Sequence, residues 1–236
     1  MLYVVLAAVV ACTATEHADP ADRGLPATTE VVTFETDDGV TLAADWLNGS
    51  ATAVILFHMV PPTYDRTSWP AEVVTALRDE DGHSVLVVDR RGAGESEGNA
   101  RDAYNGAKGV KDAWAAVDFV TDNGCDRVLL VGASNGTTTV LDYVADPGGR
   151  PAPAAVVWMS PGGYTTNNSR ISSLEGTARA MLVYPEAESD WPESTARPAD
   201  PGTWTFVEYA GSSHGTGLFG DGPDAAADLR AFLAEG

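Results

Sequence analysis

The chain has 236 residues, of which 44% are hydrophobic and 20% are charged, an ordinary composition for one large domain with a buried core. Its 34 acidic and 14 basic side chains give a formal net charge of -20. Such a surface repels phosphate groups, so the composition argues against a nucleic-acid partner. Two explanations of the acidity stay open. In the first, the protein works in high salt, as in a halophilic organism, where like-charge repulsion is screened. In the second, it is an acidic secreted protein.

The first twelve residues resemble the start of an exported protein. Residues 1–11 are apolar and uncharged, too short to span a bilayer but suited to a signal peptide. They lead into Val-Val-Ala-Cys, which is similar to a lipobox in which Cys12 would carry lipid. Residues 13–29 are polar and predict a tether, and residues 30–236 predict one domain. We therefore expect an exported chain, either a cell-surface lipoprotein held on the membrane through Cys12 or a secreted protein.

Only one other cysteine, Cys125, is present in the sequence. If Cys12 carries lipid or is removed, Cys125 has no partner within the chain. We therefore expect no structural disulfide and a fold that depends on its hydrophobic core. We also expect the protein to be a monomer.

From residue 30 onward the chain alternates predicted strands and helices. Two alternating segments flank Asp-Asp-Gly and predict an antiparallel hairpin. Six apolar runs predict buried strands, and helical periodicity predicts four helices among them. The strands are expected at 30–36, 40–46, 53–57, 85–88, 127–131, 155–159, 180–184 and 203–207, and the helices at 70–80, 107–121, 135–145 and 224–234. This order predicts an α/β domain whose mostly parallel eight-stranded sheet is flanked by helices on both faces.

The strongest chemical signal is Gly-Ala-Ser-Asn-Gly at residues 132–136. It follows a predicted strand and precedes a predicted helix, which is the context of a G-x-S-x-G elbow. Glycines relieve crowding in such a turn, and the N-terminus of the following helix supplies N–H groups for an oxyanion. A turn with an ordinary capping serine is the plain alternative. The flanking elements favour Ser134 as a nucleophile.

A serine hydroxyl needs a base, and four histidines are available. His17 lies in the predicted tether, and His83 begins a strand and is expected to be a surface polar residue. His214 follows the last predicted strand and precedes the C-terminal helix, so its loop can bring the imidazole over the elbow. His214 is therefore the expected general base, and His58 is expected to be structural, hydrogen-bonded within its own loop.

Three further segments complete a resemblance to the α/β-hydrolase superfamily over residues 30–236. Residues 89–96, Asp-Arg-Arg-Gly-Ala-Gly-Glu-Ser, look like the superfamily's D-x-R-G-x-G-x-S segment. Residues 57–59, Phe-His-Met, stand where many members have a His-Gly pair. Residues 211–216, Gly-Ser-Ser-His-Gly-Thr, are similar to the histidine loop. The resemblance implies a Ser-His-acid triad, and it leaves the substrate open because this fold hosts many reactions.

The resemblance also implies where the acid lies, in the turn after the predicted strand 180–184. If Pro185 replaces the glycine of a G-x-x-D turn, the acid is Glu188. Asp190 is the second candidate and Glu186 the third. Any of these carboxylates could orient the imidazole, and a solvated loop acid is the plain alternative for each.

An oxyanion hole needs two N–H donors. One is expected from Asn135, the residue after the nucleophile. By analogy with the His-Gly-x pattern, the other is expected from Val60, or else from Met59, which replaces the usual glycine.

About twenty residues separate the strands predicted at 155–159 and 180–184, too few for the helical cap that many superfamily members carry. We expect a shallow site, no cap domain, and a small or extended ester as substrate. The lidless dienelactone-hydrolase-like and cutinase-like members are the nearest architectural analogues. An amidase or peptidase with the same triad and a catalytically decayed, surface-tethered binding domain are the alternatives. No metal cluster or nucleotide loop is apparent in the sequence, so no cofactor is expected.

Overall fold

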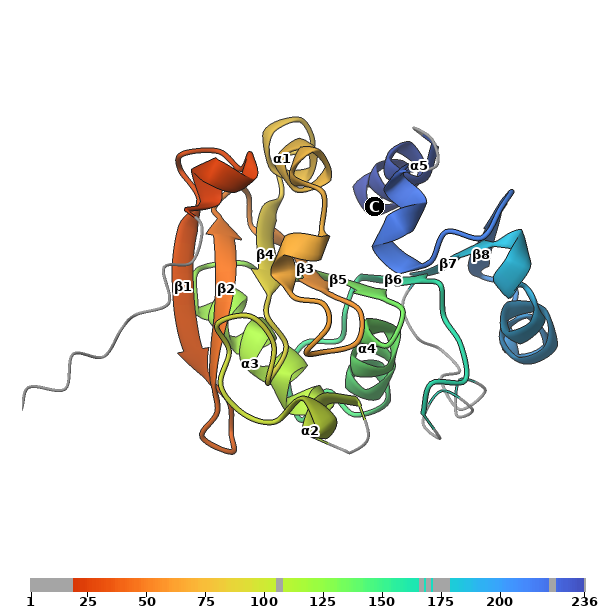
Figure 1. The fold of residues 1–236 in the computed structure, drawn as a ribbon, viewed down its shortest axis with the longest axis horizontal. Helices are drawn as coiled ribbons and strands as arrows, with labels where there is room; N and C mark the ends of the chain where they lie inside the picture. The colour runs from red at the N-terminus through yellow and green to blue at the C-terminus, as the bar shows by residue number, and fades with distance from the viewer. Residues whose placement is uncertain are drawn as a thin grey trace, which may run out of the picture.

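An eight-stranded sheet in the order β1-β2-β4-β3-β5-β6-β7-β8 forms the centre of the fold in a computed structural model (Figure 1). The structure describes residues 19–104, 108–165, 168, 171, 179–220 and 224–235. The strands are β1 (Glu30–Glu35), β2 (Thr41–Leu47), β3 (Thr52–Phe57), β4 (Ser84–Val88), β5 (Arg127–Ala133), β6 (Ala155–Met159), β7 (Arg179–Pro185) and β8 (Trp204–Tyr209). β1 pairs with β2 and β2 with β4 in antiparallel fashion, and all five other pairs are parallel. The carboxyl ends of β3 to β8 therefore meet at one edge.

Helices cover both faces of the sheet, as Figure 1 shows. The helices are α1 (Ala71–Asp79), α2 (Ala100–Tyr104), α3 (Gly109–Asp122), α4 (Gly136–Ala145) and α5 (Asp224–Ala234). α1 and α5 bury their apolar sides on one face, and α3 and α4 on the other. In α3 the buried Val110, Val117 and Val120 recur at helical spacing, so one stripe of the helix packs on the sheet. Each face has its own hydrophobic cluster, and the central strands are buried on both sides.

The predicted α/β architecture is confirmed, with eight strands and helices on both faces. Strand ends differ from the predictions by one or two residues, and α5 has the predicted bounds. The sequence patterns did not indicate α2 or several short turns, because segments this short carry no periodicity. These turns are the 3₁₀ segments η1 (Pro20–Arg23), η2 (Arg66–Ser68), η4 (Glu186–Glu188), η6 (Arg197–Ala199) and η7 (Gly215–Gly220), and the π-helical turn η5 (Pro192–Ala196).

The predicted tether over residues 13–29 is wrong for its described part. Residues 20–23 form η1, whose Arg23 donates two hydrogen bonds of 2.7 Å to the buried carboxylate of Asp45 on β2. Leu25 is buried against the cluster under α1. A polar composition suggested a solvated linker, but Arg23 binds β2 and Leu25 packs beside α1, so this short segment lies on the domain.

The predicted signal segment, with Cys12 and its lipid, lies in residues 1–18, outside the described residues, as does His17. Cys125 is a free, buried thiol. Within the described ranges, no helix is both long and apolar enough to cross a membrane.

Candidate active site

Ser134 lies at the sharp turn between β5 and α4, with a left-handed backbone φ of 50°. Its N–H donates a 2.8 Å hydrogen bond to the carbonyl of Met159 at the end of β6. A non-glycine residue in this region is strained, and such strain persists only where the surroundings impose it. The turn therefore holds the serine at the carboxyl edge of the sheet.

Two glycines allow the elbow to pack this closely. A Cβ at Gly136 would lie 2.4 Å from the carbonyl oxygen of Phe57 on β3, and a Cβ at Gly132 would lie 2.6 Å from the carbonyl oxygen of Gly136. Both distances are far below van der Waals contact, so a side chain at either position would push α4 away from the sheet. This is the physical reason for the glycine spacing in the motif.

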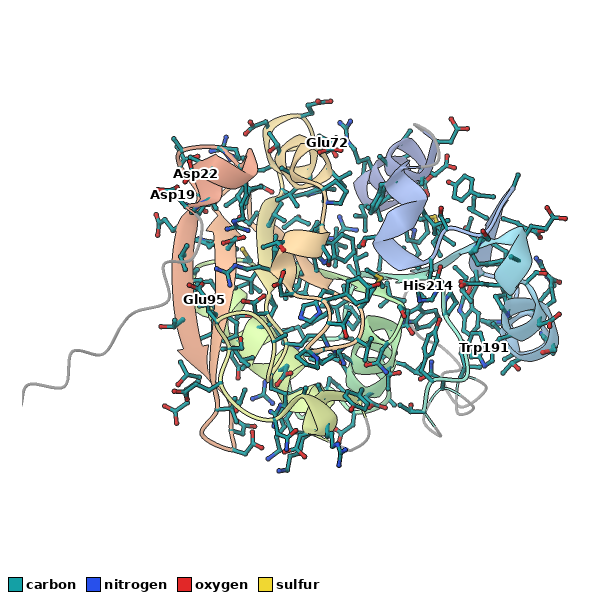
Figure 2. The ribbon with its side chains drawn as sticks, viewed as in Figure 1. Asp19, Asp22, Glu72, Glu95, Trp191 and His214 are labelled. Atoms are coloured by element: carbon teal, nitrogen blue, oxygen red, sulfur yellow. The ribbon has the colours of Figure 1, made fainter. Side chains whose placement is uncertain are left out.

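The structure brings Ser134, His214 and Glu188 into one chain of hydrogen bonds. His214 Nε2 lies 2.6 Å from Ser134 Oγ, and His214 Nδ1 lies 2.6 Å from Glu188 Oε1. A carboxylate only accepts hydrogen bonds, so Nδ1 carries the proton and Nε2 accepts from the serine hydroxyl. In Figure 2, His214 lies on the segment between β8 and α5, and Trp191 on the segment after β7. These segments are joined by the hydrogen bond from Ala187 N to Gly211 O.

The other two candidate acids point elsewhere. Among the described contacts, His214 is paired with Glu188 and with neither Glu186 nor Asp190. Glu186 and Asp190 are exposed, whereas Glu188 is partly buried in η4 with its second oxygen, Oε2, fully covered. Glu188 is thus the carboxylate that can hold the imidazole.

His58 and His83 lie away from these contacts. His58 is fully buried, its Nε2 accepts from Arg90 N at 2.9 Å, and its Nδ1 lies 2.9 Å from the carbonyl of Met59. Burial holds the pKa of His58 well below its ordinary value, so the ring is neutral and fixes the backbone of its loop. His83 is also buried, contrary to the surface position expected for it, and burial lowers its pKa too.

The buried guanidinium of Arg90 connects the two segments expected to form the oxyanion hole. It donates to Met59 O at 3.1 Å, in the loop after β3, and to Asn135 Oδ1 and Thr139 Oγ1 at 3.0 Å, in and before α4. Burial lowers the pKa of Arg90 to about 10. The sequence showed Arg90 only as part of a superfamily motif, and this bridging role was not predicted. Asn135, Val60 and Met59 therefore belong to two segments that are tied together beside Ser134.

Ser160 binds the histidine loop, and this residue was not predicted from the sequence. It follows β6, is fully buried, and has a φ of 48°. Its Oγ accepts a 2.9 Å hydrogen bond from the N–H of Gly215, the residue after His214. A Cβ at Gly215 would lie 2.5 Å from the sulfur of Met59, so the histidine loop and the loop after β3 are also in direct contact.

An open groove of about 470 Å³ begins where these two loops meet. Most of its lining side chains are polar, with four aliphatic hydroxyl groups, one carboxylate and one phenol. The lining residues are Met59, Thr63, Tyr64, Asp65, Thr67, Ser68, Thr216 and Gly217. The groove therefore lies between the loop after β3 and the residues that follow His214. The region where a cap would stand, residues 160–178, is described only at 160–165, 168 and 171.

The described side chains include no group of three or more histidine, cysteine, aspartate or glutamate residues placed to hold a metal ion. The chemistry that this arrangement can perform with its own groups is nucleophilic attack by a serine whose proton passes to a histidine.

Comparison with known proteins supports the fold and the family. The family described as Serine aminopeptidase, S33, matches residues 51–187, more than half of the chain and including Ser134. The esterase Pf2001 of Pyrococcus furiosus superposes with a TM-score of 0.72 at 17% identity, covering 93% of this chain and 96% of that one. The esterase RhEst1 of Rhodococcus sp. ECU1013 superposes with a TM-score of 0.64 at 14% identity, covering 87% and 98%. A search of curated protein sequences gives no match. At these identities the solved structures show a shared fold.

Proposed function

The chain belongs to the α/β-hydrolase family described as Serine aminopeptidase, S33, and from this premise we propose that it hydrolyses carboxylic esters through an acyl-enzyme. Ser134 is the nucleophile, His214 the general base, and Glu188 the acid that orients the base. The observation that carries the proposal is the unbroken chain of two 2.6 Å contacts from Ser134 through His214 to Glu188.

In the first half of the reaction, Ser134 Oγ attacks the ester carbonyl carbon while its proton moves to His214 Nε2. Glu188 stabilises the resulting imidazolium through the Nδ1 hydrogen bond. The carbonyl oxygen becomes an oxyanion, which the N–H groups of Asn135 and Val60, or Met59 in place of Val60, stabilise. The C–O bond then breaks, and the leaving oxygen takes the proton from Nε2.

In the second half, water takes the place of the leaving alcohol. His214 accepts a proton from the water as its oxygen attacks the acyl carbon, and Ser134 Oγ regains a proton as the carboxylic acid leaves. Every proton is carried by a group within the chain of contacts, so no cofactor enters the proposal.

Hydrolysis of amides or peptides is the second candidate, and the family's description favours it. The same triad serves both reactions, but an amine leaving group departs only after protonation. Comparing kcat/KM on matched p-nitrophenyl esters and p-nitroanilides distinguishes the two. A higher kcat/KM on the anilide would replace the ester proposal with the amide one.

A fluorophosphonate probe tests the nucleophile directly. The wild type should be labelled at Ser134 and the Ser134→Ala variant should not, with ester turnover falling by about 10⁴ to 10⁶ in kcat. Ser50→Ala, which changes an exposed serine before β3, is the control and should be labelled like the wild type. A folded wild type that neither reacts with the probe nor hydrolyses an ester would leave the decayed binding domain as the function.

A further inference from the structure

Tyr164 lies over the proposed triad, on the segment that follows β6. Its hydroxyl donates a 2.5 Å hydrogen bond to the carbonyl of Ser160 and lies close to the side chain of Ser134. Its ring stands at 84° to the imidazole of His214, with centroids 6.2 Å apart. The residue is 38% exposed, so one side of it is open to solvent. The proposed mechanism leaves this hydroxyl without a role.

The segment is built to hold the tyrosine there. A Cβ at Gly162 would lie 2.9 Å from Tyr164 Cζ, so only glycine lets the ring fold back. The buried Asn168 donates from Nδ2 to Gly162 O at 2.5 Å and accepts from Thr138 Oγ1 of α4 at 2.7 Å. The phenol is therefore fixed relative to the helix that begins beside Ser134, and it loses little freedom when substrate binds.

The sheet order determines which part of a substrate meets this hydroxyl. β5, which carries Ser134, lies between β3 and β6. The expected oxyanion donors, Asn135 and the loop after β3, are at the start of α4 and on the β3 side, whereas Tyr164 is on the β6 side next to His214. The leaving group must lie near His214, because Nε2 gives it a proton.

We propose that Tyr164 is a further catalytic residue, whose hydroxyl donates a hydrogen bond to the leaving-group oxygen as the C–O bond breaks. The inference rests on the proposed ester hydrolysis. The bond from Ser134 Oγ to the acyl carbon is kept. The bond from that carbon to the leaving oxygen breaks, its electron pair stays on the leaving oxygen, and this oxygen takes the proton from His214 Nε2. Tyr164 keeps its own proton throughout and only turns its hydroxyl from Ser160 O toward the developing alkoxide.

The protonation state of the phenol fits this role. Burial, together with the negative charge of Glu188, raises the pKa of Tyr164 to about 12. The hydroxyl is therefore a neutral donor across the neutral and mildly alkaline pH range. A hydrogen bond to a charged oxygen is stronger than one to a neutral carbonyl, so the gain grows as the alkoxide develops.

A series of esters with one acyl group and alcohols of rising pKa tests the inference on Tyr164→Phe, which removes only the hydroxyl. For alkyl esters, whose alkoxide needs stabilising, kcat/KM should fall by about tenfold or more. For p-nitrophenyl esters, whose leaving group is already stable, it should change by less than about twofold. The dependence of rate on leaving-group pKa should therefore be steeper in the variant.

Tyr143→Phe is the matched control, because it also removes a tyrosine hydroxyl bonded to a carbonyl, that of Pro151 at 2.7 Å. It should lower the melting temperature without changing the leaving-group dependence. Gly162→Ala keeps the hydroxyl but displaces the ring, and it should reproduce the steeper dependence.

A loss of equal size across the whole ester series, or no loss at all, would overturn the role of Tyr164. Fluorophosphonate labelling separates this result from a failure of the proposed function. A Tyr164→Phe variant that is labelled at Ser134 but keeps the wild-type leaving-group dependence contradicts only the present inference. A wild type without labelling contradicts both.

Discussion

At the scale of single residues, the acid of the triad depends on two positions in one loop. Glu188 and Asp190 carry the same functional group, but the geometry of η4 turns only Glu188 toward the imidazole, 2.6 Å from Nδ1. Glu188 Oε2 is covered by protein atoms, whereas Asp190 is exposed. A hydrogen bond to a charged group is strongest where it is shielded from solvent, so these two carboxylates should differ sharply in their effect on catalysis.

Glu188→Gln should lower kcat by about 10³ to 10⁴, because an amide can present its N–H₂ to Nδ1 and favour the wrong tautomer. Asp190→Asn, two residues away and exposed, is the matched control and should change kcat by less than about threefold. The measurement is kcat on one p-nitrophenyl ester, with circular dichroism to show that both variants are folded. The opposite ranking would move the acid to Asp190.

A second pairing at this scale ties the β1–β2 turn to the loop after β4. Arg91 is buried and donates from both Nη atoms to Asp38 in the turn, at 3.0 and 3.1 Å, and from Nε to Asp112 of α3 at 2.7 Å. The bidentate hydrogen bond from Arg91 lowers the pKa of Asp38 well below its ordinary value. This depression links the stability of the hairpin to pH.

Asp38→Asn should destabilise the protein by about 1 to 3 kcal/mol at neutral pH, as measured by urea unfolding. Since the pKa of Asp38 is lower in the folded state, its contribution is complete above the unfolded pKa near 3.9 and is lost as the pH falls through the folded pKa. The difference between wild type and variant should therefore shrink in acid. Asp37→Asn, at the more exposed neighbour, should change stability by less than about 0.5 kcal/mol. A stability difference between wild type and Asp38→Asn that stays constant down to about pH 2 would show that the effect does not come from the charge of Asp38.

At the scale of elements, the site depends on how closely α4 approaches β3. The carbonyl oxygens of Phe57 and His58 would lie 2.4 and 2.6 Å from a Cβ at Gly136, so the first turn of α4 rests on the end of β3. Arg90 bonds across the same junction. The nucleophile and the loop after β3 are therefore positioned by one packing contact between two elements.

Gly136→Ala should lower the free energy of unfolding by about 1 to 3 kcal/mol, because the new methyl group must displace main-chain atoms rather than a flexible side chain. It should also reduce kcat, since α4 carries Asn135 and follows Ser134. Gly220→Ala is the control, because a Cβ there meets nothing within 4 Å, and it should be neutral within about 0.5 kcal/mol. Unchanged stability in Gly136→Ala would show that the elbow tolerates a wider gap. Urea unfolding and ester turnover measure the two effects.

At the scale of the whole molecule, charge is the dominant feature. Eight arginines and both lysines form ion pairs with carboxylates. With 34 acidic and 14 basic side chains in the sequence, a surplus of 34 − 14 = 20 negative charges has no cation in the chain to offset it. Like-charge repulsion across a compact domain should oppose folding when salt does not screen it.

The melting temperature should rise as sodium chloride increases from about 0.01 M to about 1 M, where the Debye length falls from roughly 30 Å to roughly 3 Å. Sucrose is the control, because it strengthens apolar burial by exclusion but does not screen charge. At matched water activity, sodium chloride should raise the melting temperature by more than sucrose does. A melting temperature that chloride leaves unmoved would show that the acidic groups are too dispersed to repel, and the high-salt interpretation would be rejected.

The sequence by itself determined the α/β class, the strand order along the chain and the elbow around Ser134, because apolar periodicity and glycine spacing are local properties that survive without tertiary contacts. The sequence predicted that His214 would serve Ser134, but the contacts across long sequence separations are seen only in the tertiary structure. Examples are the meeting of Ser134 with His214, 80 positions apart, and the bridge from Arg90 to Asn135, 45 positions apart. The resemblance ranked Glu188 ahead of Asp190, and the tertiary structure shows the contact with His214, whereas the position of Tyr164 was not predicted. Both contacts come from the tertiary structure. They depend on side-chain direction at the edge of the sheet, which a local pattern does not encode, since it arises where segments distant in the chain pack together.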